Sequence, residues 1–247
     1  WVVSRQRAWG VPLSIFINKK TGKPLKDKDV NRRIADSFRE NGSDSWFSIE
    51  SSEYLGDKYD PDDWEKVNDI LDVWFDSGST HAFVLENDDN LSSPANLYLE
   101  GSDQHRGWFQ SSLLESCGTR GVAPFEQVLT HGFVMDKDGR KMSKSIGNVI
   151  LPDDLINQYG ADVVRLWVVS SDFTEDLRIG QEIMKANVES YRKIRNTFRF
   201  LLGNLNGFSS KEIVRYEDMP ELERYILHKL KVIDEKIIEG YNDYDLK

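Results

Sequence analysis

The sequence predicts an α/β domain followed by an all-α segment. Two apolar segments, residues 96–100 and 127–135, have the length of strands and enclose a helical stretch at 104–117. Strand, helix and strand in this order form the crossover unit of a parallel sheet. From Gly180 onward, apolar residues recur at spacings of three and four, which is the period of a helix that faces a core. With 39% hydrophobic and 30% charged residues, the 247-residue chain has the composition of a soluble globular protein of one or two domains.

The elements before residue 96 follow from local signals. Alternating apolar residues at 11–17 predict a strand, which a turn at 18–22 ends. Asp29 is predicted to cap a short helix that stops at Asn41-Gly42. Residues 43–95 are rich in Ser, Asp, Asn, Gly and Pro, so we expect mostly loop with short elements there.

The later part of the chain is predicted to be helical. Pro152 opens one helix, Gly160 interrupts it, and residues 161–169 resume it. We place a domain boundary near Asp172, and beyond it two core-facing helices are expected. The first apolar stripe comprises Met184, Asn187, Tyr191, Ile194, Phe198, Leu201 and Leu205, and the second comprises Leu222, Ile226, Leu230, Ile233 and Ile237.

The charge and the cysteine content of the sequence exclude several classes of protein. The formal net charge is -10, which argues against a protein that simply coats nucleic acid. The acidity is local, however: residues 44–103 carry a net charge of -14, whereas residues 1–43 carry +6. A single cysteine, Cys117, excludes an intrachain disulfide and a cysteine-cluster zinc site, and indicates a reducing compartment. No signal peptide opens the chain, and no run approaches the roughly 18 apolar residues of a membrane span.

One loop carries the most specific chemistry. The string Lys-Met-Ser-Lys-Ser occupies residues 141–145, follows a tight turn at Asp138-Gly139 and precedes Gly147-Asn148. A loop of this kind can bring Lys141 and Lys144 onto a polyphosphate, where charge-assisted hydrogen bonds are strong. A lysine pair alone more often marks a solvated basic loop. The literal five-residue string after a predicted strand favours a phosphate site.

This string resembles a motif of the class I aminoacyl-tRNA synthetases, which activate an amino acid with ATP and then acylate tRNA. Their companion motif, His-x-Gly-His, is absent, because His81, His105, His131 and His228 are isolated. The chain also begins at Trp1 rather than at Met. We therefore expect it to be a later part of the catalytic domain together with the start of the next domain, inactive by itself.

Three further stretches resemble the isoleucine-specific, bacterial-type branch of this class. They are the segment Ser-Arg-Gln-Arg-Ala-Trp-Gly at 4–10, where the chain re-enters the catalytic domain after the editing insertion, Asp-Val-Trp-Phe-Asp-Ser-Gly-Ser at 72–79, and Leu-Glu-Gly-Ser-Asp-Gln-His-Arg-Gly-Trp-Phe at 99–109. Enzymes for valine and leucine share the general layout, so they remain alternatives. A smaller nucleotidyltransferase, or a tRNA- or nucleotide-binding module without catalysis, is a further alternative.

The resemblance implies a domain plan and a set of partners. Residues 1–70 would re-enter the catalytic domain after the insertion, residues 71–172 would complete its Rossmann-like C-terminal half, and residues 173–247 would begin an all-α anticodon- and stem-contact domain. The implied partners are isoleucine, ATP with Mg²⁺, and tRNA(Ile), with no membrane and no zinc site in this chain. A cytoplasmic, monomeric complete enzyme is expected, and the chain lacks the editing domain.

The resemblance also implies roles for individual residues. Lys141 and Lys144 would be catalytic, and Trp74 and Trp108 would wall the aliphatic side chain, although aromatic residues more often form plain core. Glu100, at the end of a strand, would pair with the substrate ammonium, because open α/β sheets bind ligands at the carboxyl ends of their strands. The expected ATP- and adenylate-binding residues are Glu100, Gly101, Asp103, Gln104, His131, Gly132 and Lys144. The candidate tRNA contacts are Arg5, Arg7, Arg192, Arg195 and Arg199, with structural salt bridges or a solvated helix face as the alternatives.

Overall fold

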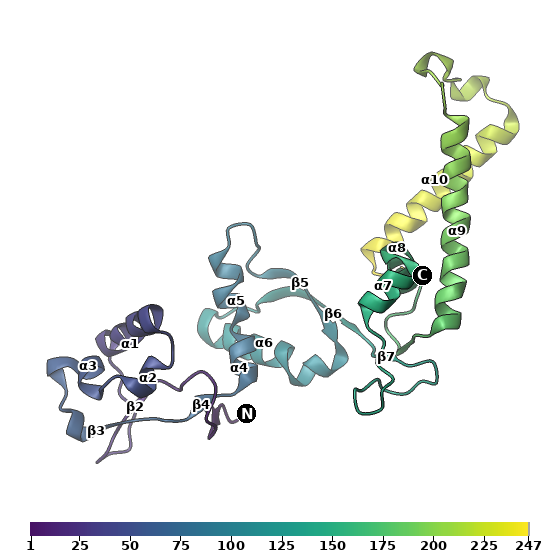
Figure 1. Cartoon of the computed structure of the whole chain (residues 1–247). Coiled ribbons are helices and arrows are strands. Elements are labelled where there is room, and N and C mark those ends of the chain that lie inside the picture. The colour runs from purple at the N-terminus through teal and green to yellow at the C-terminus, as the bar shows by residue number, and fades with distance from the viewer. Residues whose placement is uncertain (247) are drawn as a thin grey trace. The chain divides into compact units, whose positions relative to one another are not determined.

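Helices and short strands alternate along the chain, which divides into two units, Trp1–Leu129 and Thr130–Lys247 (Figure 1). The computed structural model describes residues 1–246. The expected mixture of helix and strand is confirmed. The strands of the first unit are β1 (Ser4–Arg5), β2 (Phe16–Asn18), β3 (Trp64–Lys66), β4 (Ile70–Leu71), β5 (Ala95–Gly101) and β6 (Phe125–His131). Its helices are α1 (Lys28–Asn41), α2 (Ser45–Ser48), α3 (Ser51–Leu55), α4 (Val73–Gly78), α5 (Thr80–Phe83) and α6 (Trp108–Arg120).

The strands of the first unit pair in short two-stranded sheets. β1 is antiparallel to β4, β2 is antiparallel to β3, and β5 pairs with β6. The predicted strand at 11–17 is shorter than expected. Only a bridge at Pro12 and the strand β2 form, and between them the Ile15 N–H donates to the Leu13 carbonyl instead of to a neighbouring strand. The predicted turn at 18–22 is confirmed, since Gly22 donates to the Asn18 carbonyl and takes a left-handed φ of 65°.

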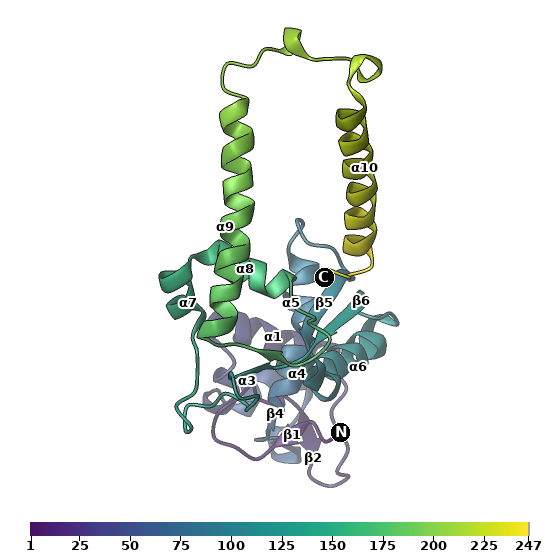
Figure 2. The same cartoon turned by 90° about the vertical axis from the view of Figure 1, so that its right-hand side faces the viewer.

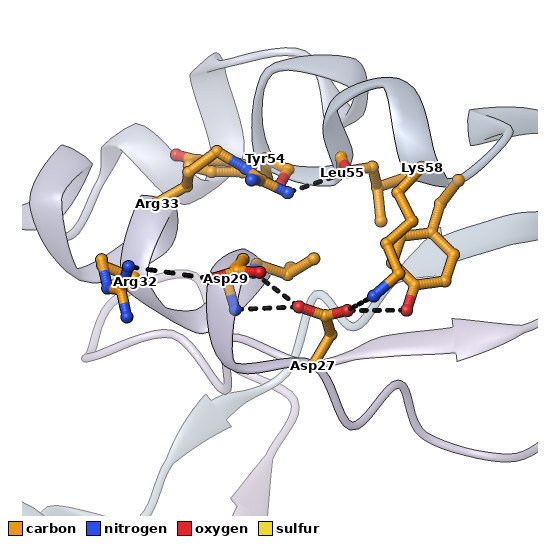
Figure 3. A network of polar contacts seen from close by, with 9 residues as sticks. Asp27, Asp29, Arg32, Arg33, Tyr54, Leu55 and Lys58 are labelled. Atoms are coloured by element: carbon orange, nitrogen blue, oxygen red, sulfur yellow. Dashed lines mark hydrogen bonds and ion pairs between the residues drawn. The ribbon is translucent and has the colours of Figure 1, made fainter.

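Helix α1 is held at its first turn by Asp27, not by Asp29 as the sequence suggested (Figure 3). Asp27 Oδ1 accepts hydrogen bonds from the backbone N–H groups of Asp29 and Val30 at 2.8 and 3.2 Å. Its Oδ2 accepts from Lys58 and from the Tyr59 hydroxyl. These contacts lower the pKa of Asp27, the Lys58 hydrogen bond most of all. A capping residue with these extra partners ties α1 to the segment after α3.

The aromatic core of this region lies in the segment for which the sequence predicted mostly loop. Trp46 and Leu55 are fully buried, and Phe16 packs edge-on against Trp46 with ring centroids 5.0 Å apart. Trp46 Nε1 donates to the Val67 carbonyl, which satisfies its buried polar atom. The elements at 43–95 are short, as expected, but the aromatic residues in them anchor the fold.

The second predicted strand, at 127–135, is divided between two strand pairs, β5 with β6 and β7 (Val134–Met135) with β8 (Leu177–Arg178). β6 ends at His131, and β7 is parallel to β8. The break lies at Gly132, whose N–H donates to the carbonyl of Phe173 rather than continuing the ladder. A contact with a residue distant in sequence thus divides the segment that the local pattern predicted as one strand.

Among the described residues of the second unit, four α-helices follow, and the first two agree with the prediction. They are α7 (Pro152–Tyr159), α8 (Ala161–Val169), α9 (Gln181–Asn204) and α10 (Glu221–Asn242). Trp167 of α8 and Met184 of α9 are buried in one core with Leu155 of α7, and Ile179 closes it. None of the helices described here is both long and apolar enough to cross a membrane.

The apolar stripes of α9 and α10 are only partly buried, so the prediction of two core-facing helices is wrong for most of their length. Figure 2 shows α9 and α10 as two long helices joined by an irregular segment. Met184 is fully buried, but Phe198 farther along α9 is 61% exposed and Ile226 of α10 is 56% exposed. Only the first turns of α9 meet α8 within this unit, so the periodic pattern continues beyond the core that it joins.

Candidate functional site

In the first unit, the candidate residues gather where β5 ends. Gly101 is buried at the end of the strand, and a tight helical turn, Ser102–Arg106, follows it directly. Glu100 is exposed, and its Oε1 accepts a hydrogen bond from the Gly101 N–H at 3.0 Å. The carboxylate therefore stands at the strand terminus with a fixed local orientation, the position at which open α/β sheets present ligand-binding groups.

The side chain of Gln104 links this turn to helix α6. Its Oε1 accepts from the backbone N–H of Trp108 at 2.9 Å, and its Nε2 donates to Asp103 Oδ2 at 3.2 Å. The sequence predicted a helix from residue 104, whereas α6 begins at Trp108 after the tight turn. Because Gln104 supplies an acceptor at the start of α6, part of its amide is committed to structure.

The Trp74 ring lies against Gly107, the residue before Trp108. A side chain at Gly107 would meet Gln104 Oε1 at 2.7 Å and the Trp74 ring at 3.1 Å, so glycine allows these groups to come together. Trp108 stacks on Tyr98 of β5, with centroids 4.2 Å apart and an angle of 10° between the planes. Trp108 Nε1 donates to Thr80 Oγ1 at 3.1 Å, which fixes the ring from its polar edge.

Trp74 also lines a cleft of about 830 Å³ in the first unit. Arg5 and Arg7 lie in the same lining. Arg5 forms an ion pair with Asp72, and Asp72 Oδ1 accepts from the N–H of Trp74 at 2.8 Å as the cap of α4. Arg5 therefore has the structural salt bridge that was the alternative to tRNA contact, while Arg7 is exposed at the cleft.

Glu115 is a half-buried carboxyl group on α6, the helix that begins at Trp108. Glu115 of α6 faces Gly78 of α4, where a Cβ atom would be only 2.3 Å from its Oε1. This oxygen has no hydrogen-bond partner among the residues that the structure describes. Burial, and then the negative charge of Asp76, raise the pKa of Glu115 to about 7. Glu115 is thus a proton-binding group between the helices that carry Trp74 and Trp108.

This pKa makes the stability of the chain dependent on pH. Between about 4.5 and about 7, folded Glu115 keeps a proton that the unfolded chain has released, so the free energy of unfolding falls as pH rises through this window. Glu115→Gln removes this loss. We expect the difference in the free energy of unfolding between the variant and the parent to grow by about 1–2 kcal/mol in favour of the variant from pH 5 to pH 8. This figure allows for the partial exposure of Glu115.

Thermal unfolding at both pH values measures this gain. Glu53→Gln, at an exposed position of α3, is the matched control and should show no such pH-dependent difference. An equal offset between Glu115→Gln and the parent at pH 5 and pH 8 would refute the assignment.

In the second unit, His131 is the last residue of β6 and Gly132 follows it. The His131 ring Nδ1 lies 2.8 Å from the carbonyl of Gly132. A Cβ atom at Gly132 would lie 2.3 Å from the carbonyl oxygen of Glu175, so the close backbone approach that glycine allows is made by residues of this chain. Phe133 N–H donates to Asp176 Oδ1 at 2.7 Å, which holds the same two segments together.

The loop with the Lys-Met-Ser-Lys-Ser string is anchored on one side and exposed on the other. Met142 packs against the core of α7, α8 and α9, whereas Lys141 and Lys144 are exposed. Lys141 Nζ lies 5.9 Å from the centroid of the Phe133 ring. A turn follows Lys144, where Gly147 takes a left-handed φ of 73° and its N–H donates to the carbonyls of Ser143 and Lys144. The loop thus presents two cations to solvent from an anchored base.

The three candidate arginines of α9 are exposed. Arg192 pairs with Glu189 one turn earlier, N to O 2.6 Å, which is a weak surface ion pair. Within residues 1–246, no group of three or more His, Cys, Asp or Glu side chains is placed to hold a metal ion. The structure thus brings together Trp74, Gln104 and Trp108 in one unit and the two lysines in the other.

Sequence reasoning missed three contributors to these arrangements. Tyr98 supplies the stacking face for Trp108, and Thr80 its hydrogen-bond partner. Asp136 accepts backbone hydrogen bonds from the loop that it precedes. Only Asp136 had a readable signal, because aspartate two residues before an Asp-Gly turn is typical of a side chain that caps the turn. The other two depend on contacts between distant elements.

The chain matches the model of a known family. The model of the tRNA synthetases class I (I, L, M and V) matches residues 1–180. The chain belongs to this class I tRNA synthetase family.

Its curated relatives point to one member of the class. The chain is 58% identical to isoleucine--tRNA ligase of Zymomonas mobilis over 99% of this chain and 26% of the relative. It is 56% identical to that of Pelagibacter ubique over 99% of this chain and 27% of the relative. The resemblance to isoleucine enzymes is confirmed, and the chain spans about a quarter of the length of these relatives.

Solved structures agree on the fold. A complex of LeuRS with tRNA and LeuAMS from Agrobacterium radiobacter K84 has a TM-score of 0.73 and 20% identity, over 100% of this chain and 34% of that one. Methionyl-tRNA synthetase of Mycobacterium tuberculosis with methionyl-adenylate has a TM-score of 0.58 and 16% identity, over 92% of this chain and 51% of that one.

Proposed function

We propose that this chain belongs to an enzyme that activates isoleucine with ATP to isoleucyl-adenylate and then acylates tRNA(Ile). The observation that carries the proposal is an identity of 54–59% to isoleucine--tRNA ligases over nearly the whole chain. The Lys-Met-Ser-Lys-Ser loop, exposed on an anchored base, supports it. A cytoplasmic location and a monomeric enzyme belong to the same proposal.

The domain plan follows from this function. Residues 1–70 re-enter the catalytic domain, residues 71–172 complete its Rossmann-like half, and residues 173–247 begin the helical domain that contacts tRNA. The family match to residues 1–180 and the change to long helices at α9 support this division.

The first unit holds the amino acid and part of the adenylate. Glu100, at the end of β5, pairs with the substrate ammonium, because a carboxylate beside a buried strand end recognises a cation well. Trp74 and Trp108 form the apolar wall for the isoleucine side chain; the position of the Trp74 ring against Gly107, directly before Trp108, supports this. Asp103, beside Gln104, accepts hydrogen bonds from the ribose hydroxyls, and Gly101 lets the adenylate approach the backbone.

The second unit supplies the phosphate chemistry. The isoleucine carboxylate attacks the α-phosphate of ATP in line, and pyrophosphate leaves; Mg²⁺ enters as part of the ATP substrate. Little covalent participation is required of the protein, so positioning and charge stabilisation account for the rate. Lys144 and Lys141 hold the leaving pyrophosphate, and their exposure on the loop supports this role. His131 and Gly132 lie on the nucleotide side.

tRNA contact is assigned to the basic residues outside these groups. Arg195 and Arg199 are exposed on α9, where cations can contact phosphates without reading sequence. Arg192 lies on the same helix, and its ion pair with Glu189 is weak enough to be exchanged for a phosphate contact. Arg7 lies at the cleft of the first unit, and Arg5 contributes by holding α4 through Asp72.

A chimera tests this function directly. In the Zymomonas chimera, this chain replaces the matching segment of the Zymomonas mobilis isoleucine--tRNA ligase. We expect it to charge tRNA(Ile) with isoleucine within about tenfold of the native ligase, because the replaced segment is 58% identical. The measurement is incorporation of labelled isoleucine into tRNA.

A second chimera controls for loss of activity that is caused only by joining a foreign segment to the ligase. It carries the corresponding segment of the Pelagibacter ubique ligase, which is 56% identical to this chain. Charging by the second chimera but not by the first would contradict the proposed function. If the 247-residue chain binds tRNA on filters while the first chimera remains inactive, the chain is a binding module without catalysis.

A further inference from the structure

The two ends of the Lys-Met-Ser-Lys-Ser loop are tied together by Asp136 and Asn148. Asp136 directly follows β7 and is only 7% exposed, although it belongs to a cationic loop. Its Oδ1 accepts from the backbone N–H groups of Asp138 and Arg140 at 2.9 and 2.8 Å. Its Oδ2 accepts from Asn148 Nδ2 at 2.9 Å. One carboxylate thus holds both the turn at the start of the loop and the residue at its end.

Asn148 extends the same network to the middle of the loop. Its Oδ1 accepts from the Ser143 N–H at 2.9 Å, and its Nδ2 also donates to the carbonyl of Lys141 at 3.3 Å. The backbone on both sides of Met142 is therefore held by one amide. Since Met142 itself packs into the core, Lys141 and Lys144 are fixed relative to the unit from two directions.

The network depends on Asp136 being ionised. The Arg140 N–H and the Asn148 amide lower the pKa of Asp136, and the Asp138 N–H and the Arg140 charge act in the same direction. A buried carboxylate that accepts several N–H groups forms stronger hydrogen bonds than a neutral acceptor. The charge of Arg140 is partly directed to Asp138, at 3.6 Å.

We propose that Asp136 and Asn148 are positioning residues, which hold the loop closed at its base so that Lys141 and Lys144 are presented together to the phosphates of ATP. The role in catalysis rests on the proposed function. Neither residue touches the substrate in this proposal, and both act through the loop backbone.

Asp136→Asn tests the hydrogen bond that Asp136 Oδ2 accepts from Asn148. The variant keeps Oδ1 as acceptor for the two backbone N–H groups but places an NH₂ group against the NH₂ group of Asn148. The swap Asp136→Asn with Asn148→Asp restores a donor opposite an acceptor and keeps an acceptor for Ser143, but it removes the weaker hydrogen bond from residue 148 to the Lys141 carbonyl. Asp138→Asn, which removes a charge from the exposed part of the same loop, is the matched control.

The first readout is independent of catalysis. Trypsin cleaves after Arg140, Lys141 and Lys144, so its rate in the 247-residue chain reports opening of the loop. We expect about tenfold faster cleavage at these sites in Asp136→Asn, from loss of a charge-assisted hydrogen bond, and slower cleavage in the swap than in Asp136→Asn, since the contact between residues 136 and 148 is restored while that to the Lys141 carbonyl is lost. Asp138→Asn should cleave within about twofold of the parent.

The second readout is isoleucine-dependent ATP–pyrophosphate exchange in the Zymomonas chimera. We expect kcat to fall about tenfold in Asp136→Asn with the KM for isoleucine unchanged, and the swap to recover part of this loss, because a displaced loop affects phosphate chemistry rather than amino-acid binding. Asn148→Ala provides a second variant, which leaves the backbone contacts of Asp136 in place.

The possible results test separate parts of the proposal. Unchanged trypsin cleavage in both Asp136→Asn and Asn148→Ala overturns the tie at the loop base, whatever the enzyme does. Faster cleavage with unchanged exchange overturns the positioning role. An unsubstituted chimera without exchange refutes the proposed function and the catalytic role with it, while the trypsin result still decides whether Asp136 and Asn148 close the loop.

Discussion

Replacement of Lys144 by Ala is expected to slow isoleucine-dependent ATP–pyrophosphate exchange about 10²–10³-fold in the Zymomonas chimera, the range for loss of one donor to developing charge. Negative charge accumulates on the leaving pyrophosphate in the transition state, and a lysine ammonium in this position stabilises it more than it stabilises bound ATP. The loss should therefore fall mainly on kcat. Lys144 is suited to this role because it is exposed beside a turn whose neighbour Met142 is anchored.

Lys137→Ala is the matched control for Lys144→Ala. Lys137 is an exposed lysine of the same loop, and its Cβ packs near Gly180. We expect its exchange rate to stay within about threefold of the unsubstituted chimera. Exchange by Lys144→Ala within a few-fold of the unsubstituted chimera would remove this lysine from the catalytic step.

Glu100→Gln is expected to lower kcat/KM for isoleucine about 10²-fold, mainly through a higher KM. Loss of one charge from a desolvated, hydrogen-bonded ion pair costs about 2–5 kcal/mol, because the ammonium is then left unpaired. The amide keeps the size of the side chain and an acceptor for the Gly101 N–H, so the end of β5 should stay in place. Exchange at varied isoleucine concentrations measures both constants.

Two comparisons make the Glu100 result specific. Every amino acid carries the same ammonium, so kcat/KM for valine should fall by the same factor as that for isoleucine. Glu126→Gln, an exposed strand glutamate that accepts from Asn96 at 3.4 Å, should leave both constants unchanged. A changed ratio of isoleucine to valine would place Glu100 at the substrate side chain instead of at its ammonium.

Local signals in the sequence were sufficient where an element begins and ends with its own residues. Pro152 and Gly160 bound α7 as predicted, and α8 spans Ala161–Val169 as expected. β5 extends the predicted segment by one residue at each end. Proline at a first turn and glycine after a last turn act through backbone geometry alone, so no knowledge of the remaining fold was needed.

The errors arose where a distant segment decides the structure. The strand at 127–135 is broken because Gly132 donates to Phe173, which no local pattern indicates. The stripes of α9 and α10 have helical periodicity, but periodicity does not reveal how much of a stripe meets a core; Leu230 is 61% exposed.

In the candidate site, too, local motifs were predictable from the sequence and contacts between distant residues were not. The motifs identified the strand end at Glu100 and the lysine loop, but not the groups that hold them. Arg5 pairs with Asp72, which in turn caps the helix of Trp74, and Tyr98 stacks on Trp108. These contacts join residues far apart in the chain, so only the folded structure identifies them.

The most direct test of the proposed function compares isoleucine, valine and leucine as substrates for ATP–pyrophosphate exchange by the Zymomonas chimera. We expect the highest kcat/KM for isoleucine, with valine lower by about 10²-fold; isoleucine against valine is the standard example of what one methylene contributes in an apolar pocket. Leucine should support less exchange than isoleucine. Exchange that is equal or faster with valine or leucine would contradict the assignment to isoleucine.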